Sequence, residues 1–441
     1  MKTPIYDFLK QYDQKNPIRL HMPGSKGKVS IPFGFDITEI DGADFLFSSN
    51  GIIKESEQNA SSLFNTAATL YSTEGSSLCI KTMIALLKKT GINSILAARN
   101  SHMSFLNACI LSDMNVSWIY PDNKISSICS GEYTADLIDS ALSKTEIKAV
   151  YVTSPDYLGN ILNIKAIAEV CKRHGAYLLV DNAHGAYLKF LAPDLHPISL
   201  GADMCCDSAH KTLPAMTGGA YLHISRETDE AFIKNAKSVM SVFATSSPSY
   251  MIMASLDFTN RIINDEIRRF NETALMVERL KSELFRLGFI NISKEPFKIA
   301  IDAMQSGINT KELYEFLRLK NIVSEYADDA SLVMMFSVMN GEEDYEKTLS
   351  AFKEAAGKIS EYKNLDNEFL ITEKVQAVNM RNAFFADSEE INTEFSEGRI
   401  CSAAKTVCPP CIPVICAGEV FDQNAIKILK KYGILKVSVV K

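Results

Sequence analysis

The sequence lacks the features that would point to a membrane or to nucleic acid. No apolar run approaches the roughly 20 residues that cross a bilayer, and the polar start MKTPIYDFLK does not resemble a secretion signal. There is no basic excess either, because 46 Lys and Arg stand against 53 Asp and Glu, giving a net charge of −7. We therefore expect a soluble, cytoplasmic protein of two or three domains with neither nucleic acid nor membrane as a partner.

The ten cysteines show little pattern, and most are expected to be reduced thiols. A group near the end is denser and contains a C-x-x-C pair; it consists of Cys401, Cys408, Cys411 and Cys416. A zinc site or a redox pair are the alternatives to plain thiols. Because the outer two cysteines do not form a second close pair, we favour plain thiols and expect no metal.

Two nucleotide-binding fingerprints are also missing, since the chain has no G-x-G-x-x-G, and residues 21–28 (HMPGSKGK) do not fit a P-loop. What the chain has instead, between residues 72 and 224, is an alternation of short apolar runs and amphipathic stretches. This pattern predicts an α/β fold with a mostly parallel sheet, helices on both faces and active groups at the carboxyl ends of the strands. The predicted strands are 95–98, 116–120, 147–153, 177–181, 204–208 and 220–224, and the helices are 78–89, 101–111 and 163–174.

The character changes after residue 224. Apolar positions at helical spacing over 262–287 predict a long connecting helix, and shorter strand and helix candidates follow from residue 289. We therefore predict four segments, which are an N-terminal arm (1–20), a cofactor-binding large domain (21–260), a connecting helix (261–288) and a smaller C-terminal α+β domain (289–441).

Two polar motifs stand where helices are predicted to begin. Residues 73–77 (TEGSS) join a glycine to two hydroxyls, and such a turn either binds phosphate through free N–H groups or simply caps the helix. His102 follows a predicted strand, where a histidine can stack on a planar ligand, move protons or act as a cap.

Two further motifs follow buried strands. Asp181 directly follows the apolar run YLLV. A carboxylate buried there needs a positive partner, which can be a protonated ring nitrogen, an arginine or a metal. Metal is the weakest of these interpretations, because nothing besides His184 completes a metal site. Lys211, between Ser208, His210 and a threonine, is a candidate Schiff-base lysine. One strand-crossover-strand step separates Asp181 from Lys211, so both are expected at one edge of the sheet. Together the four motifs supply what pyridoxal phosphate requires.

Several stretches resemble the Orn/Lys/Arg decarboxylases, which are fold type I pyridoxal-phosphate enzymes. They are HMPG, TEGSS, RNSHMS, TSPDYLGN, LLVDNAHGAY, SAHKTLPAMTGGAYLH, TSSPSYMIMASLD and CPPCIPVICAGE, spread over residues 21–419. The resemblance is to the short bacterial form without an N-terminal wing domain. It implies decarboxylation of arginine, lysine or ornithine to the amine and carbon dioxide, within polyamine metabolism. Other chemistry on the same cofactor (an aminotransferase or lyase) and a degenerate, non-catalytic relative are the alternatives.

The resemblance also implies a role for particular residues. Lys211 forms the Schiff base with the cofactor, Asp181 pairs with its pyridine nitrogen, and His102 stacks on its ring. Glu419 recognises the substrate cation, and Thr245 reaches the phosphate of a neighbouring subunit, which implies a homodimer with a shared active site. The remaining cofactor contacts are Ala183 on the other ring face, His184 near the phenolic oxygen, and Ser76, Ser77, Ser208 and His210 around the phosphate. The chain departs from the family's usual residues at Ser25, Met103, Asp156, Asn182, Cys408 and Cys411.

Overall fold

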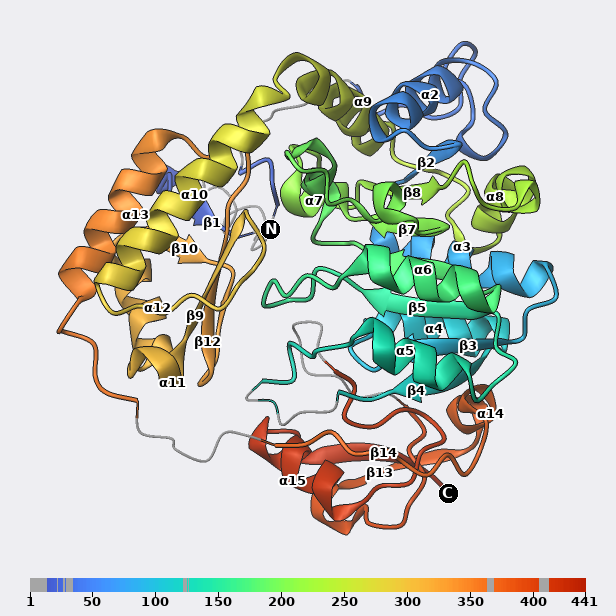
Figure 1. Ribbon diagram of the computed structural model, residues 1–441. Helices are drawn as coiled ribbons and strands as arrows, with labels where there is room; N and C mark the ends of the chain where they lie inside the picture. Colours follow the sequence, from blue (N-terminus) through green and yellow to red (C-terminus); the bar gives the residue numbers. More distant parts are fainter. Residues whose placement is uncertain are drawn as a thin grey trace, which may run out of the picture.

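The computed structural model describes residues 14–441 except 22, 27, 29–34, 122–124, 126, 363–368 and 404–411. Its largest element is a seven-stranded sheet with strand order β2-β8-β7-β6-β5-β3-β4 (Figure 1). Neighbouring strands are parallel except at β8, which runs antiparallel to both β7 and β2. The predicted α/β class with a mostly parallel sheet is therefore confirmed. The strands are β2 (Ala68–Ser72), β3 (Ser94–Ala98), β4 (Asn115–Ile119), β5 (Ala149–Thr153), β6 (Tyr177–Asp181), β7 (Met204–Asp207) and β8 (Ala220–Ile224).

Helices cover both faces of this sheet because its central strands are apolar on both sides. Tyr151 and Leu179 point into one core, with α3, α4 and α8, whereas Val150 and Leu178 point into the opposite core, with α5 and α6. This alternation follows from the two-residue period of a strand. The helices are α3 (Gly75–Lys89), α4 (Met103–Ser112), α5 (Ala135–Leu142), α6 (Ile164–His174) and α8 (Glu230–Phe243).

Four chain segments leave the sheet at the carboxyl ends of parallel strands and so meet at one edge. They are the start of α3 after β2, residues 99–102 after β3, the turn after β6, and α7 (Ala209–Thr212) after β7. The other helices of this part of the chain are α2 (Ile52–Phe64) and the 3-10 helices η2 (Leu46–Ser48), η3 (Ala186–Phe190) and η4 (Pro197–Leu200). Each of the four predicted polar motifs therefore begins at this edge.

A second part of the molecule lies beside the sheet and is reached through α9 (Tyr250–Asp265) and α10 (Arg268–Arg286) (Figure 1). The prediction of one continuous helix over 262–287 is wrong at its beginning. The helix is interrupted at Glu266 and Ile267, so residues 262–265 belong to the end of α9 and α10 begins at Arg268. This part contains a three-stranded antiparallel sheet, and β1 (Ile18–Leu20) pairs in parallel with β10 (Ile322–Ser324) beside it. Its other elements are β9 (Lys298–Asp302), β11 (Tyr326–Ala327), β12 (Ser331–Met335), α11 (Ala303–Ser306), α12 (Thr310–Leu319) and α13 (Glu342–Ala355).

The C-terminal residues form a further antiparallel pair of strands, which lies beyond the β4 edge of the large sheet (Figure 1). Here Met380 and Ala383 join the core formed by α3 and α4. Residues after 289 thus contribute to separate sheets, and the boundaries drawn from the sequence stay a prediction. The elements are α14 (Met380–Phe385), β13 (Ser388–Asn392), the 3-10 helix η5 (Thr393–Phe395), α15 (Gln423–Lys431) and β14 (Lys436–Val440).

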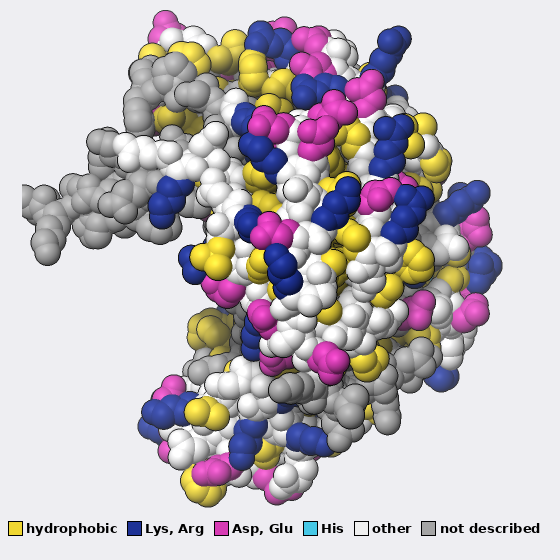
Figure 2. All heavy atoms as spheres, turned by 90° about the vertical axis from the view of Figure 1, so that its left-hand side faces the viewer, with side chains coloured by type: hydrophobic (Ala, Val, Ile, Leu, Met, Phe, Trp, Pro, Cys, Tyr) yellow, Lys and Arg dark blue, Asp and Glu magenta, His cyan; other side chains and the backbone are white. Residues whose placement is uncertain are grey.

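The outer surface of the second part is strongly charged but mixed in sign. On the face turned to the viewer in Figure 2, basic and acidic side chains are interspersed. Ion pairs such as Lys347–Glu343 and Lys320–Glu354 account for part of this pattern. Among the described residues, no helix combines the length and the apolar character needed to cross a membrane.

Candidate active site

A pocket opens at the carboxyl edge of the large sheet, and the empty space in it, counted together with adjoining open solvent, is about 490 Å³. Its wall combines titratable groups with apolar side chains. Six of the residues predicted from the sequence line it together, which are Ser76, His102, Asp181, Ala183, His184 and Lys211. The other lining residues are Asn100, Cys129, Thr153, Asp156, Tyr157 and Ile412.

Asp181 is the last residue of β6 and is 2% exposed. The main-chain N–H of Ala183 donates to its Oδ1 at 3.1 Å, and the Tyr151 hydroxyl donates to its Oδ2 at 3.2 Å. Both donors stabilise a negative charge and fix the direction of the carboxylate. Asp181 is thus an oriented anion facing the cavity from the floor of the sheet.

Lys211 lies on α7 with its ammonium nitrogen 3.1 Å from His184 Nε2. Burial lowers the pKa of Lys211 from its usual value, while the charge of Asp181 opposes that effect. Burial and the two lysines beside it lower the pKa of His184 well below its usual value, so this imidazole is neutral. A desolvated amine beside a neutral base is the environment in which a lysine becomes nucleophilic near neutral pH.

The second lysine beside His184 was not anticipated from the sequence. Lys298, the first residue of β9, approaches His184 Nδ1 at 3.4 Å, the Glu295 carboxylate at 2.7 Å and the main-chain oxygen of Asp156 at 3.2 Å. It comes from a plain apolar strand in the second part of the molecule. No local motif could have identified it, because only the tertiary fold brings β9 to this edge.

His102 is the N-cap of α4, and its Nδ1 accepts a hydrogen bond from the Ser104 N–H at 3.1 Å. The Ser104 hydroxyl is 2.8 Å from the same nitrogen and 2.6 Å from the Ser77 hydroxyl. Burial lowers the pKa of His102, so the ring is a neutral, oriented plane at the cavity wall. The capping and ligand-stacking interpretations of His102 are therefore compatible.

The start of α3 provides a cluster of hydroxyls. Ser208 Oγ donates to Ser76 Oγ at 2.8 Å. The N-cap residue of α3 is Glu74, and its side chain does not form a capping hydrogen bond. Uncapped N–H groups at a helix start attract anions. His210 is turned the other way, with Nδ1 3.0 Å from the Gly219 carbonyl, and burial lowers its pKa to about 4.

Five predicted site residues are not part of the cavity wall, which are Ser77, Ser208 and His210, described above, and Thr245 and Glu419. Thr245 is exposed, its N–H donates to the Glu74 carboxylate at 2.7 Å, and its hydroxyl accepts from Ser247 N at 3.2 Å. Glu419 is 1% exposed, and both of its carboxylate oxygens accept from Arg99 at 2.6 Å. Because Arg99 already neutralises this carboxylate, the geometry does not support the substrate-binding role predicted for Glu419.

The departures from the family pattern have different surroundings. Asp156 lines the cavity, Asn182 donates from Nδ2 to Asp207 Oδ1 at 2.6 Å, and Met103 packs against the core of α3 and α4. Ser25 is partly buried. Cys408 and Cys411 lie outside the described residues, so the cysteine group is represented by Cys401 and Cys416, which are both buried.

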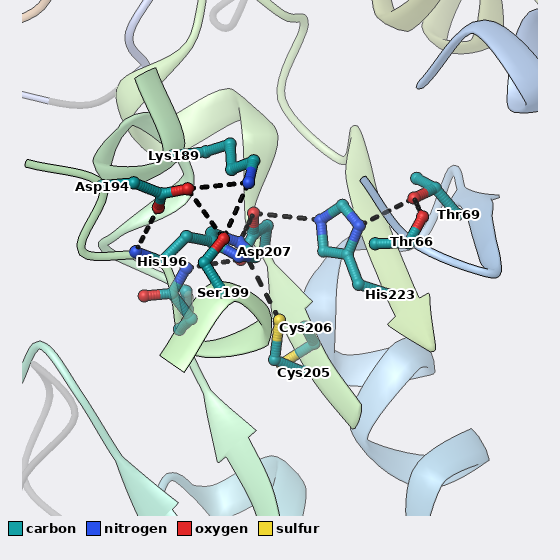
Figure 3. A network of polar contacts seen from close by, with 12 residues as sticks. Thr66, Thr69, Lys189, Asp194, His196, Ser199, Cys205, Cys206, Asp207 and His223 are labelled. Atoms are coloured by element: carbon teal, nitrogen blue, oxygen red, sulfur yellow. Dashed lines mark hydrogen bonds and ion pairs between the residues drawn. The ribbon is translucent and has the colours of Figure 1, made fainter. Parts of the chain in front are cut away.

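Asp207 belongs to a buried network next to the cavity (Figure 3). His196 Nε2 and His223 Nε2 each lie 3.0 Å from its Oδ2, and Thr69 Oγ1 is 2.9 Å from His223 Nδ1. Burial alone would raise the pKa of Asp207, but the two histidines outweigh it and hold the pKa well below its usual range. The ligand atoms of these three groups lie close enough together to hold a metal ion, and the 3.0 Å distances also fit hydrogen bonds from both imidazoles to the carboxylate.

The fold is that of known pyridoxal-phosphate enzymes of fold type I. The constitutive lysine decarboxylase of Escherichia coli superposes with a TM-score of 0.72 at 17% identity, covering 92% of this chain and 75% of that one. The serine palmitoyltransferase of Sphingomonas wittichii superposes with a TM-score of 0.57 at 16% identity, over 72% of this chain and 81% of that one. The predicted fold class is confirmed by these structures.

The family can be stated from the sequence match. The model of the "Orn/Lys/Arg decarboxylase, major domain" family matches residues 3–294, and the chain belongs to this family. The arginine decarboxylase of Bacillus subtilis (strain 168) is 27% identical over 466 aligned residues, covering 98% of this chain and 93% of the relative. The predicted enzyme class, a pyridoxal-phosphate-dependent amino-acid decarboxylase, is thereby confirmed.

Proposed function

We propose that this enzyme removes the α-carboxylate of arginine, lysine or ornithine as carbon dioxide and releases the corresponding amine for polyamine metabolism. The observation that carries the proposal is the cavity shared by Lys211, Asp181 and His102, which are an amine, an oriented anion and a flat ring from three different strand ends. The relatives that are named arginine and lysine decarboxylases support the substrate class.

The residues present fit pyridoxal phosphate as the cofactor. The side-chain atoms of Asn100 and the hydroxyl of Thr153 are buried at the cavity, and no described residue forms a hydrogen bond with them. Buried polar groups rarely stay unpaired, so such atoms indicate a polar ligand. Lys211 would hold the aldehyde carbon, Asp181 the pyridine nitrogen, and His102 and Ala183 the two ring faces. His184 would lie near the phenolic oxygen, and Ser76, Ser77, Ser208 and His210 near the phosphate.

The bound cofactor supplies an electron sink for the bond that breaks at the substrate Cα. The protein's own contribution is to orient the groups and to move protons. The Asp181 carboxylate keeps the ring nitrogen protonated, which strengthens the electron sink. The neutral His184 and the desolvated Lys211 are the groups placed to hold a proton and return it to the substrate carbon.

The proposal includes a homodimer, because Thr245 is expected to complete the phosphate site of a second subunit. Within one chain, Thr245 follows the end of α8 and is exposed. Among the described residues, its hydroxyl accepts a hydrogen bond from the main-chain N–H of Ser247. Sedimentation of the purified enzyme should give twice the chain mass. Thr245→Ala should weaken cofactor retention without changing that mass.

The test of the function is product formation. Purified enzyme with cofactor is incubated separately with arginine, lysine and ornithine, and agmatine, cadaverine, putrescine and carbon dioxide are measured. One basic amino acid should yield its amine and carbon dioxide in equal amounts, and Lys211→Ala should yield neither and should lose the visible absorbance of the covalently bound cofactor. Borohydride reduction should attach the cofactor to the peptide that contains Lys211. No amine from any of the three, at full cofactor occupancy, would refute the proposal.

A further inference from the structure

A carboxylate that is used by none of the steps above enters the cavity from the loop after β5. Asp156 is 3% exposed and lines the cavity with Lys211 and Asp181. The resemblance gives a neutral threonine at this position, so the charge is a property of this chain. Burying a carboxylate is costly unless a cation meets it.

The protein supplies Asp156 with neutral partners. Ser130 Oγ donates to its Oδ2 at 2.5 Å and the Asn160 N–H donates to its Oδ1 at 2.9 Å. In the described part of the chain, no lysine or arginine forms an ion pair with it. An asparagine could keep both contacts, with its Oδ1 accepting from the Asn160 N–H and its Nδ2 donating to Ser130 Oγ. These contacts therefore explain the shape of the side chain but not its charge.

The nearest cation is committed elsewhere. The Lys298 ammonium approaches the main-chain oxygen of Asp156 at 3.2 Å, but its ion pair, at 2.7 Å, is with Glu295. Lys298 and Glu295 thus neutralise each other, and the Asp156 charge is left for a ligand. Burial raises the pKa of Asp156 to about 6, and the hydrogen bonds from Ser130 and Asn160 and the charge of Lys298 offset this rise only in part.

Asp156 is also at a suitable place relative to the reacting amine. Three successive contacts, of 3.1, 3.4 and 3.2 Å, lead from Lys211 through His184 and Lys298 to the backbone of Asp156. A basic amino acid carries its cation on a flexible stem of about three or four methylene groups. With its α-amine at Lys211, the stem can extend along the cavity wall toward Asp156.

We propose that Asp156 binds the cationic end of the substrate side chain and so selects basic amino acids. This inference rests on the proposed function, since it names the group that recognises the substrate. Glu419, the other acid considered for that role, is held by Arg99. A guanidinium would be bound through paired N–H···O contacts and an ammonium through one.

The experiment measures binding and turnover separately on the cofactor-loaded enzyme. Arginine, lysine and ornithine are titrated against the visible absorbance of the bound cofactor, together with citrulline and norleucine as neutral counterparts. The variants are Asp156→Asn, which keeps the loop's hydrogen bonds, and Asp156→Thr, which carries the family's residue. Asp329→Asn, which replaces an exposed acid that is paired with Lys311, controls for the change in net charge.

The wild type should bind the preferred cationic amino acid at least about 10-fold more tightly than its neutral counterpart, and both Asp156 variants should lose that preference. The control should retain it, and the variants' cofactor absorbance should be unchanged.

Retention of the preference in both Asp156 variants would overturn the inference while leaving the decarboxylase assignment intact. Binding of basic amino acids that depends on Asp156, but with no carbon dioxide released, would support the inference and refute the proposed function. Failure of the wild type to bind any basic amino acid would overturn both.

Discussion

Arg99 and Glu419 are joined by two N–H···O contacts of 2.6 Å, although 320 positions separate them in the sequence. The Arg99 guanidinium also lies over the Trp118 ring, 4.7 Å from its centroid, and its Nε donates to the Pro413 carbonyl at 2.9 Å. Both charged groups are buried. The pair therefore joins the C-terminal segment to the loop that carries His102.

We expect Glu419→Gln to lower the free energy of unfolding by about 3–5 kcal/mol, because removing one partner leaves the Arg99 charge buried and unpaired. Urea unfolding followed by circular dichroism measures the change. The matched control is Glu389→Gln, which breaks the largely exposed pair with Arg399 and should change stability by no more than about 1 kcal/mol. A Glu419→Gln enzyme of unchanged stability but altered substrate preference would return Glu419 to the substrate-binding role.

The sequence predicted most of the cavity but not this pair, for a physical reason. Asp181, His102 and Lys211 directly follow strands of one sheet, so strand order alone brings them to the same edge. Arg99 and Glu419 meet only through the packing of segments that no local pattern relates. Lys298 was missed on the same grounds, since it comes from a strand of the second part.

Asp181 provides a second prediction. Asp181→Asn should lower the turnover number by at least about 100-fold, because a neutral amide no longer stabilises the charge that develops during the reaction. Steady-state kinetics with the preferred amino acid measures the loss. Tyr151→Phe removes only one hydrogen bond to this carboxylate and should cost far less. Equal losses in the two variants would indicate that the orientation of Asp181, and not its charge, is what matters.

The fold itself was predicted unevenly. The runs that became β5, β6 and β7 are apolar on both faces, which identifies central strands without tertiary information. The antiparallel direction of β8 was not predicted, since burial does not encode the direction of a strand. The break between α9 and α10 was also missed, because the charged, periodic sequence continues across residues 266–267 with no glycine or proline.

A third prediction concerns Asp156 and pH. Burial raises the pKa of Asp156 to about 6, above the usual 3.8, so ionisation opposes folding. The folded state binds the Asp156 proton more tightly than the unfolded state does. The stability that this proton adds to the fold is fully present below pH 4 and is lost as the pH rises through 6. Asp156→Asn should therefore stabilise the ligand-free protein at pH 8, by up to about 3 kcal/mol, and have little effect at pH 4.

Two titratable groups lie near Asp156. Lys298 faces it from β9, and Tyr133 interacts with it from the loop before α5; burial raises the pKa of Tyr133 above its usual value. The measurement is the urea midpoint at pH 4, 6 and 8. A variant less stable than the wild type at pH 8 would show that an unseen cation already neutralises Asp156.

The last prediction separates a hydrogen-bond network from a metal site at Asp207. If His196 and His223 donate to Asp207, as their 3.0 Å distances indicate, a chelator should leave the melting temperature unchanged, and added zinc should not raise it. Asp207→Asn should lower the free energy of unfolding by about 3 kcal/mol, because two buried N–H donors lose a charged acceptor. Asp194→Asn, at the partly exposed pair with Lys189, is the control and should have a small effect. A melting temperature that falls on chelation, in the wild type but not in Asp207→Asn, would instead assign a metal to these three residues.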